Sequence, residues 1–312
     1  MKTLLTKGLL FIASFVTVYL LLFSLLFFFQ PGGIPFIYRA TQGNLWEGGG
    51  TWLKFKNFDI EKKWNVVVLG SSHAYRGYNP DVFKSYNLEM YNLGTSNQHM
   101  MCTYYIIKNY INKDNCKILV LDMFDRVFAN NDIESKSDII QNVNNDNAAL
   151  EIALSSNDIR AFNMITLRYF NKTIAPLNTD TLGYNNGFLV ARKFLDPKKK
   201  DLSKMKWKYK TDKGQKKYLE LILAHCNENG IKIVAVSHPA PQIYPLRDHD
   251  KFLKDVGPLF EKYKIKYYDY TFSPEMGSII YYSDPSHLNH IGAIKFNKTL
   301  IHDLIKDGVI SK

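Results

Sequence analysis

An uninterrupted apolar run that ends abruptly in small polar residues constrains this chain more than any other feature. Asn65 is followed by Val66-Val67-Val68-Leu69, and then by Gly70-Ser71-Ser72-His73. Such a run of β-branched and aliphatic residues is typical of a strand buried on both faces, as in a parallel sheet covered by helices. Ligands of these sheets bind at the carboxyl ends of the strands. We therefore expect the Gly70-Ser71-Ser72 turn at a site of chemistry, with Ser72 a nucleophile if a base reaches it.

The same pattern recurs along the chain. Each further apolar run leads into a polar or glycine-containing turn and then into a stretch with helical periodicity. This alternation predicts right-handed parallel crossovers, and hence a doubly wound, flavodoxin-like α/β fold with a mostly parallel five-stranded sheet. The predicted strands cover residues 65–69, 89–93, 117–123, 231–236 and 265–268, and the clearest helices cover 213–229, 248–262 and 289–306. Between residues 132 and 212 the rhythm is lost, which predicts a mostly helical insertion with a turn at 183–187.

The amino-terminal segment is unlike the rest. Residues 8–29 contain no charge and are rich in Leu and Phe, a length that crosses the hydrocarbon layer as a helix. Lys2 and Lys7 precede this stretch, so the positive-inside rule places residues 1–7 in the cytoplasm and the remainder outside. A cleaved signal peptide is the alternative, but its apolar core would be shorter and small residues would follow it.

The segment therefore predicts a single-pass anchor in the cell membrane. A juxtamembrane linker would follow at residues 30–51, and then an extracytoplasmic domain at 52–312.

Charge and cysteine content exclude several classes of function. The formal net charge is +11, yet the basic residues are spread along the chain without a nucleic-acid-binding motif, so no nucleic-acid partner is expected. The three cysteines, Cys102, Cys116 and Cys226, lack metal-ligand spacing and are an odd number. We expect neither a disulfide framework nor a metal or other cofactor.

A second polar stretch lies just before the last predicted helix. Asp284 and His287 are three residues apart, so the carboxylate can hold the imidazole in one tautomer. The other ring nitrogen is then free to face a hydroxyl, as in a catalytic triad. In a doubly wound sheet this loop and the Ser72 turn open onto the same edge.

These stretches together resemble the SGNH (GDSL-type) hydrolase superfamily. The matching blocks are Gly70-Ser71-Ser72-His73, then Asn92-Leu93-Gly94, then Asp284-x-x-His287 followed by Leu288-Asn289 and Gly292. The anchor and the Gly-Ser-Ser form are similar to the exported branch that contains D-alanyl transfer proteins of the DltD type and polysaccharide O-acetyltransferases. The resemblance extends from about residue 65 to 304, without the insertion.

The resemblance implies roles for single residues. Ser72 would be the nucleophile, His287 the general base and Asp284 its orienting partner. The oxyanion hole would use the backbone N–H groups of Ser72 and Gly94, and an asparagine after the third strand. That asparagine is absent, because the strand leads into Met123-Phe124-Asp125-Arg126. Asn97 is a candidate replacement, although a turn asparagine is more often a helix cap.

Three further residues are candidate substrate ligands: His73, Arg76 and Arg126. A histidine at a strand end is more often a hydrogen-bonded residue of the rim, and the arginines could equally form surface ion pairs.

The resemblance as a whole implies a serine esterase or O-acyltransferase that acts on acyl groups, acetyl above all, of a cell-surface glycan. A membrane-bound O-acyltransferase is a candidate partner. The alternative is a non-catalytic accessory or glycan-binding protein that has kept the cleft.

Overall fold

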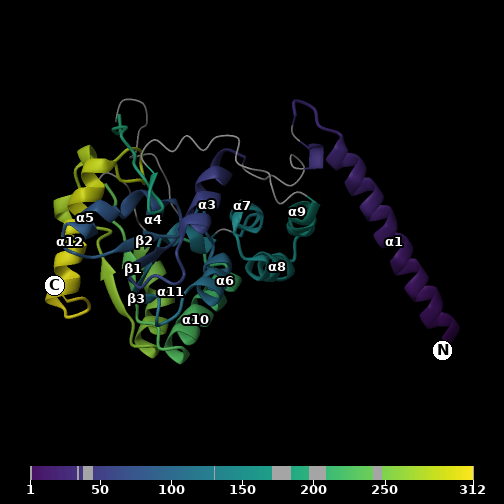
Figure 1. Ribbon diagram of the computed structural model, residues 1–312. Coiled ribbons are helices and arrows are strands. Elements are labelled where there is room, and N and C mark those ends of the chain that lie inside the picture. The colour runs from purple at the N-terminus through teal and green to yellow at the C-terminus, as the bar shows by residue number, and fades with distance from the viewer. Residues whose placement is uncertain are drawn as a thin grey trace.

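The computed structural model describes residues 2–33, 35–37, 45–129, 131–170, 184–196, 209–241 and 248–311. Parts of the expected linker and insertion, with Gly183 of the expected turn, lie outside these ranges. The described chain forms one α/β body, and a long amino-terminal helix projects from it (Figure 1).

A five-stranded sheet in the order β2-β1-β3-β6-β7 forms the centre of the body, and every pairing in it is parallel. This order confirms the doubly wound fold expected from the sequence. The strand ends differ from the predicted ones by a residue or two, as boundaries commonly do. The strands are β1 (Trp64–Leu69), β2 (Met90–Asn92), β3 (Cys116–Asp122), β6 (Ile233–Ser237) and β7 (Lys266–Asp269).

Alternate residues of the strands enter two separate cores. On β1, Val67 and Leu69 face one core, whereas Val66 and Val68 face the other, because successive side chains of a strand point to opposite faces. The first core is covered by α3 (Leu45–Asn57), α6 (Met100–Tyr110), α10 (Lys213–Glu228) and α11 (His249–Lys262).

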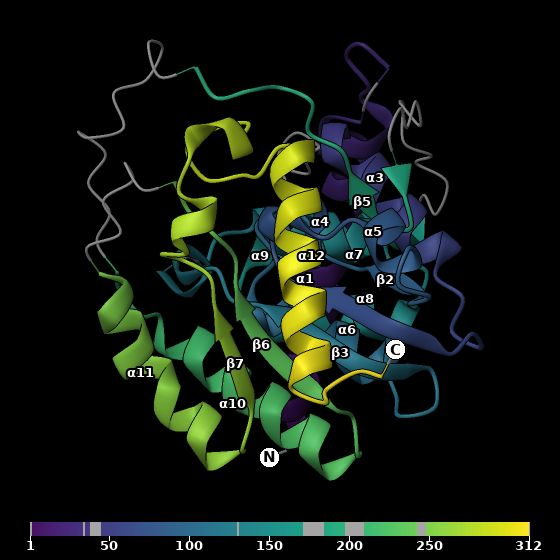
Figure 2. The same ribbon diagram turned by 90° about the vertical axis from the view of Figure 1, so that its left-hand side faces the viewer.

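The second core is smaller and lies on the opposite face of the sheet. It is covered by α4 (Ser72–Gly77), α5 (Pro80–Lys84) and α12 (His290–Lys306). Figure 2 shows α12 running across this face in front of the strands. Burial of both faces explains why the strands are apolar throughout.

Helix α3 begins earlier than the sequence suggested. The sequence indicated an irregular segment up to residue 51, but the helix starts at Leu45 and includes Gly48-Gly49-Gly50. Its carboxyl half packs on the body, where Phe55 is fully buried and Tyr91 donates a hydrogen bond to the Lys54 carbonyl at 2.8 Å. Tertiary packing thus outweighs the low helix propensity of glycine, about 1 kcal/mol per residue.

The described part of the insertion is mostly helical, as expected. It contains α7 (Glu134–Asn142), α8 (Asp146–Ser155), α9 (Ile159–Phe170) and a small hairpin, β4 (Tyr184–Asn185) with β5 (Phe188–Leu189). Short 3-10 turns lie at Asp125–Ala129, Pro274–Met276 and Ile279–Tyr281.

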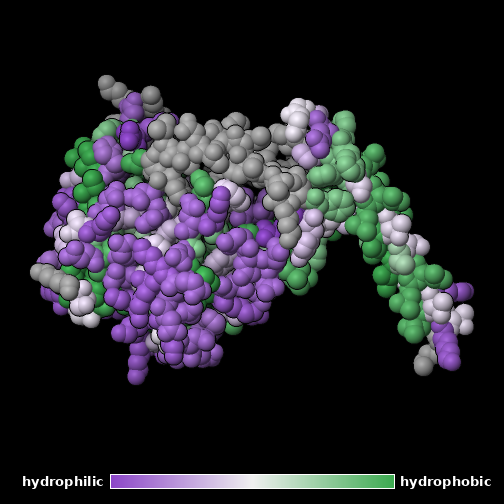
Figure 3. Space-filling view, viewed as in Figure 1, coloured by the Kyte–Doolittle hydropathy of each residue, from purple (hydrophilic) through white to green (hydrophobic). Residues whose placement is uncertain are grey.

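Helix α1 (Lys2–Phe28) projects from the body, and most of its apolar side chains are exposed (Figure 3). Its length and composition suit a membrane span, and a signal sequence would have the same properties. The hydroxyls of Thr17 and Ser24 donate to carbonyls four residues earlier, so they present no unbonded donor to an apolar medium.

Candidate active site

The turn after β1 places Ser72 at the start of α4. Gly70 has a φ of +152°, and a Cβ there would lie 2.7 Å from the Cβ of Asp122 and 3.1 Å from that of Ala74. Only glycine therefore allows the chain to turn this closely over the neighbouring strand. Ser71 is the N-cap residue of α4, and Ser72 follows as its first residue.

Ser72, His287 and Asp284 form a continuous hydrogen-bonded chain. Ser72 Oγ lies 2.7 Å from His287 Nε2, and His287 Nδ1 lies 2.8 Å from Asp284 Oδ2. The other carboxylate oxygen, Oδ1, accepts from the backbone N–H groups of Ser286 at 2.9 Å and His287 at 3.0 Å. Residues 215 positions apart in the sequence thus meet at the carboxyl edge of the sheet.

The charge on Asp284 determines the tautomer of His287. Burial alone would raise the pKa of the Asp284 carboxyl, but hydrogen bonds from the His287 side chain and from the loop backbone outweigh it and hold that pKa well below its usual range. A carboxylate accepts and does not donate, so His287 Nδ1 carries the proton. His287 Nε2 is then the acceptor for the Ser72 hydroxyl, which is the arrangement that a general base needs.

The loop that carries Asp284 and His287 is fixed at both ends. An isolated β-bridge joins Tyr282 to Leu288, and Ser283 N–H donates to the His287 carbonyl at 2.9 Å. The Asn289 amide donates to the Ile280 carbonyl at 2.7 Å, and its oxygen caps α12. The imidazole is therefore held by a preorganised loop.

The expected oxyanion donor Gly94 has another partner. Its backbone N–H donates to Asn92 Oδ1 at 3.0 Å, and the amide of Asn92 in turn donates to the Ala74 carbonyl at 2.8 Å. The Gly94 carbonyl accepts from the ammonium of Lys54, a buried residue of α3. Both backbone polar groups of Gly94 are thus hydrogen-bonded within the protein. No pattern in the sequence indicated that Lys54 would contact this glycine.

Asn97 is also engaged. Its side-chain amide donates to Asp132 Oδ2 at 2.8 Å, and its φ of +46° places it in the left-handed region of a turn. It still lines the pocket in front of Ser72, together with Ser96. In the described part of the chain, the backbone N–H groups of Ser72 and Ser96 donate to no acceptor. Since both residues line the pocket, these two groups are candidate backbone donors to a developing oxyanion.

His73 lines the pocket in front of Ser72 but is almost entirely buried. Its ring is 4% exposed and stacks on His287, with ring centroids 4.4 Å apart and an interplanar angle of 14°. Phe124 and His238 contact it at centroid distances of 3.6 and 4.3 Å. Burial, followed by the charges of neighbouring groups, holds the pKa of His73 well below its usual value. Because His73 points inward, its neutral ring packs against the imidazole of His287.

The two candidate arginines line two different hollows next to the hydrogen-bonded residues Ser72, His287 and Asp284. Arg76 Nη1 is 4.0 Å from Asp284 Oδ2, and Arg76 lines a hollow with the exposed residues Arg192 and Lys193. Arg126 is exposed at the rim of the pocket that contains Ser72. Arg126 thus lines the pocket that contains Ser72, and Arg76 forms an ion pair with the carboxylate of Asp284.

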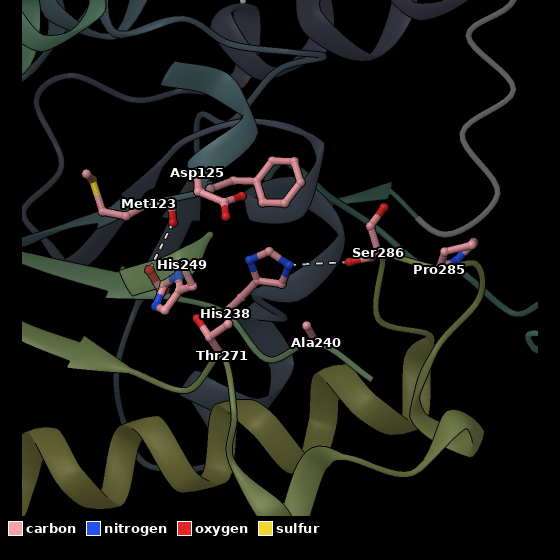
Figure 4. Close-up of a pocket in the computed structure, with 10 residues that line it drawn as sticks. Met123, Asp125, His238, Ala240, His249, Thr271, Pro285 and Ser286 are labelled. Carbon is pink, nitrogen blue, oxygen red and sulfur yellow. Dashed lines mark hydrogen bonds between the residues drawn. The ribbon is translucent and has the colours of Figure 1, made fainter. Parts of the chain in front are cut away.

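A buried polar layer behind the site was not recognised in the sequence. The ring of His238 donates from Nε2 to the Ser286 carbonyl at 3.3 Å, and burial lowers its pKa to about 3 (Figure 4). Its Nδ1 faces Asp122 Oδ2 at 3.8 Å, and the Tyr78 hydroxyl donates to that oxygen at 2.9 Å. Burial raises the pKa of Asp122 to about 7. Asp122, a carboxylate in the otherwise apolar end of β3, was the sequence signal that could have indicated this buried layer.

The chain from residue 184 to 196 crosses the carboxyl edge of the sheet and forms one wall of the site. At one end the Asn92 N–H donates to the Asn186 carbonyl at 2.9 Å. At the other end the N–H groups of Leu195 and His290 donate to the carbonyls of Tyr282 and Ala191, each at 2.8 Å. Part of the insertion is therefore tied directly to the catalytic loop.

Nothing in the described ranges resembles a metal centre, since no three His, Cys, Asp or Glu side chains are grouped in the way that metal binding needs. Cys102, Cys116 and Cys226 are buried and unpaired. Burial raises the pKa of each thiol to about 12, so none is a reactive thiolate at neutral pH.

Comparison with known proteins finds no matching family model and no matching curated protein. Three solved structures show a distant likeness. A Bacteroides fragilis protein assigned as an acylhydrolase has 14% identity and a TM-score of 0.41, covering 83% of this chain and 96% of its own. An acetyl xylan esterase, AlAXEase, has 12% identity and a TM-score of 0.41, covering 77% and 100%. A gut microbial diltiazem-metabolizing enzyme has 11% identity and a TM-score of 0.27, covering 80% and 48%.

Proposed function

We propose that this protein is a membrane-anchored serine esterase or O-acyltransferase. The observation that carries the proposal is the chain of two short hydrogen bonds from Ser72 through His287 to Asp284, at 2.7 and 2.8 Å. A serine hydroxyl that donates to an imidazole, whose other nitrogen donates to a carboxylate, is the arrangement of an activated nucleophile.

The reaction follows from these contacts. His287 Nε2 takes the proton of the Ser72 hydroxyl while Oγ attacks the acyl carbonyl, and Asp284 stabilises the imidazolium that forms. The tetrahedral oxyanion is bound by the backbone N–H groups of Ser72 and Ser96. Collapse expels the alcohol, which takes its proton from His287, and leaves an acyl-serine. Water or a sugar hydroxyl, deprotonated by His287, then releases the acyl group.

The substrate that we propose is an ester-linked acyl group, acetyl above all, on a cell-surface glycan. The open pocket in front of Ser72 suits a polymer, because it is exposed to solvent and its lining combines Phe124 and Ala129 with the polar side chains of Ser96, Asn97 and the exposed Arg126. We propose further that α1 remains as a single-pass anchor with its amino end in the cytoplasm, so that the site lies outside the cell. A membrane-bound O-acyltransferase that delivers the acyl group is the partner this arrangement would need for transfer.

Substitution of Ser72 tests the proposal. In Ser72→Ala, hydrolysis of an aryl acetate should fall by at least about a thousandfold, since triad members contribute factors of this order. Ser71→Ala is the matched control, because Ser71 is adjacent and its hydroxyl caps α4 and contacts His73 Nδ1 at 3.1 Å rather than His287. It should keep activity within about tenfold, since a lost cap costs about 1 kcal/mol. Equal turnover by Ser72→Ala and the unsubstituted protein would refute the assignment.

A second candidate is a non-catalytic accessory protein that binds a glycan or a membrane acyltransferase. It is favoured by the engagement of the Gly94 N–H with Asn92 and of the Asn97 amide with Asp132, which occupies two expected oxyanion donors. Active-serine labelling with a fluorophosphonate separates the candidates. Labelling that is lost in Ser72→Ala supports the enzyme, whereas a folded protein that remains unlabelled supports the binder.

A further inference from the structure

The outer faces of α8 and α9 are apolar and lack unpaired charge. The residues of α9 that are most exposed as a whole are aliphatic or aromatic, namely Ile159, Phe162, Tyr169 and Phe170, and the Arg160 side chain, 40% exposed, lies beside them in an ion pair. Those of α8 are Asn147, Leu150 and Leu154. Leu154 and Ile159 are 58% and 66% exposed.

Every charged residue from 146 to 170 lies in an ion pair. Arg168 Nη2 lies 2.6 Å from Asp146 Oδ1, and Arg160 Nη2 lies 2.8 Å from Asp158 Oδ2. Glu151 pairs with Lys108 of α6. The chain has 40 basic residues, yet each charged side chain of α8, α9 and the turn between them has a partner of opposite charge. Exposed apolar side chains gathered on one face mark a surface that contacts a protein partner or a membrane, and the contact of α9 with α1 favours the membrane.

Helix α9 also packs directly on α1. The Tyr19 hydroxyl donates to Asn163 Oδ1 at 2.8 Å, and the Phe170 ring lies 5.2 Å from that of Phe23 and 5.8 Å from that of Phe27. Figure 1 shows α9 beside the carboxyl-terminal end of α1. These contacts make the apolar face of α9 continuous with the apolar surface of α1.

The depth of this contact follows from helix geometry. Tyr19 lies about 13 Å along the axis before the end of α1 at a rise of 1.5 Å per residue. The hydrocarbon layer is about 30 Å thick. If α1 crosses it, a helix that hydrogen-bonds to Tyr19 lies within the outer leaflet or at its boundary.

We infer that the outer face of α8 and α9 is a lipid-binding surface that rests in the outer leaflet of the membrane crossed by α1. The ligand is the boundary between lipid headgroups and acyl chains, with Leu154, Ile159 and Phe162 immersed. The inference rests on the proposed anchoring role of α1. Its consequence is a second attachment to the bilayer, which holds the catalytic domain against the membrane surface.

Site-directed labelling tests this inference on the full-length chain in vesicles of phosphatidylcholine and phosphatidylglycerol. Leu154→Cys and Phe162→Cys would carry an environment-sensitive fluorophore. The three native cysteines are buried, so the new thiol reacts selectively. Ile280→Cys is the matched control, because Ile280 is 55% exposed against 58% for Leu154 but lies beside the catalytic loop. A circular dichroism spectrum and melting temperature equal to those of the unsubstituted protein show that each labelled protein is folded.

Nitroxide lipids in the vesicles should quench the labels at 154 and 162 at least threefold more than the label at 280. Equal quenching at all three positions would overturn the inference. So would labels at 154 and 162 that are shielded from water yet unquenched, because a second copy or a protein partner would then cover the face.

Alkaline carbonate extraction separates this inference from the proposed anchor. Protein that stays with the vesicles while its Leu154→Cys label is unquenched retains the anchor and refutes the lipid surface alone. Protein that is extracted refutes the anchor, and the lipid surface with it. Ser72→Ala should alter neither readout, so failure of the proposed catalysis is recognised independently.

Discussion

Asp122, the buried carboxyl beneath the nucleophile turn, should make the stability of the protein depend on pH. The carboxyl is 1% exposed, its Oδ1 has no hydrogen-bond partner among the described residues, and Oδ2 accepts a hydrogen bond from Tyr78. Burial therefore raises its pKa from 3.8 to about 7. A change of this size corresponds to about 4 kcal/mol of differential interaction between the two protonation states.

The sign follows from linkage. Because the folded state holds the Asp122 proton more tightly than the unfolded state, the protonated carboxyl stabilises the fold fully below pH 3.8. This stabilisation is lost as the pH rises through about 7. Between pH 5 and pH 8 the loss is about 3 kcal/mol. Asp122→Asn removes the titration, so the difference in unfolding free energy between the unsubstituted protein and this variant should fall by that amount over the same range.

Urea unfolding of the full-length chain in detergent at pH 5, 6, 7 and 8 measures this difference, in which the titrations of other groups cancel. Tyr78→Phe is the control. It keeps the carboxyl but removes a hydrogen bond that lowers the Asp122 pKa, so its loss of stability should persist and move to higher pH. A difference between the unsubstituted protein and Asp122→Asn that stays constant within about 0.5 kcal/mol would refute the reasoning.

Substitutions at Asp284, His73 and Gly187, with controls for the last two, probe the site further. Asp284→Asn should lower aryl acetate turnover by about 10⁴-fold at neutral pH, since an amide favours the wrong imidazole tautomer; a loss below tenfold would contradict the assigned orientation. His73→Ala should lower kcat at least about tenfold, because it opens a cavity behind the general base, whereas His73→Phe should keep most activity and the pH profile of kcat; equal losses in both variants would exclude a packing role. Gly187→Ala should destabilise the β4–β5 hairpin and raise KM, since its Cβ would lie 1.8 Å from the Asn92 carbonyl oxygen at a φ of +86°. In the control Gly257→Ala, in α11, the new Cβ meets nothing within 4 Å, so this variant should be neutral or stabilising. Circular dichroism melts distinguish these outcomes.

Local features of the sequence were sufficient to predict the sheet and the turn at Ser72. Strands buried on both faces require continuous apolar residues, so the number of strands and the position of the polar turns follow from periodicity. The parallel direction of the strands follows from their alternation with helices. The three-residue spacing of Asp284 and His287 is likewise a local property, and the structure places this pair beside Ser72.

Interactions between distant segments decided what surrounds the hydrogen-bonded residues Ser72, His287 and Asp284. The sequence could not show that Gly94 N–H is taken by Asn92, that Asn97 binds Asp132, or that His73 points inward against His287, since each depends on packing across elements. Helix α3 forms over a glycine triplet for the same reason. Propensity is a weak local preference of at most about 1 kcal/mol per residue, and burial against the body exceeds it.

The sequence by itself therefore determined the type of fold and indicated the candidate reactive residues, because both depend on hydrophobic periodicity and on the chemistry of single side chains. Tertiary structure alone decided which donors remain for an oxyanion, which histidine supports His287, and that the insertion meets α1 through Asn163 and Phe170. These depend on the directions of individual hydrogen bonds and on contacts between segments far apart in the chain, and no local pattern encodes them.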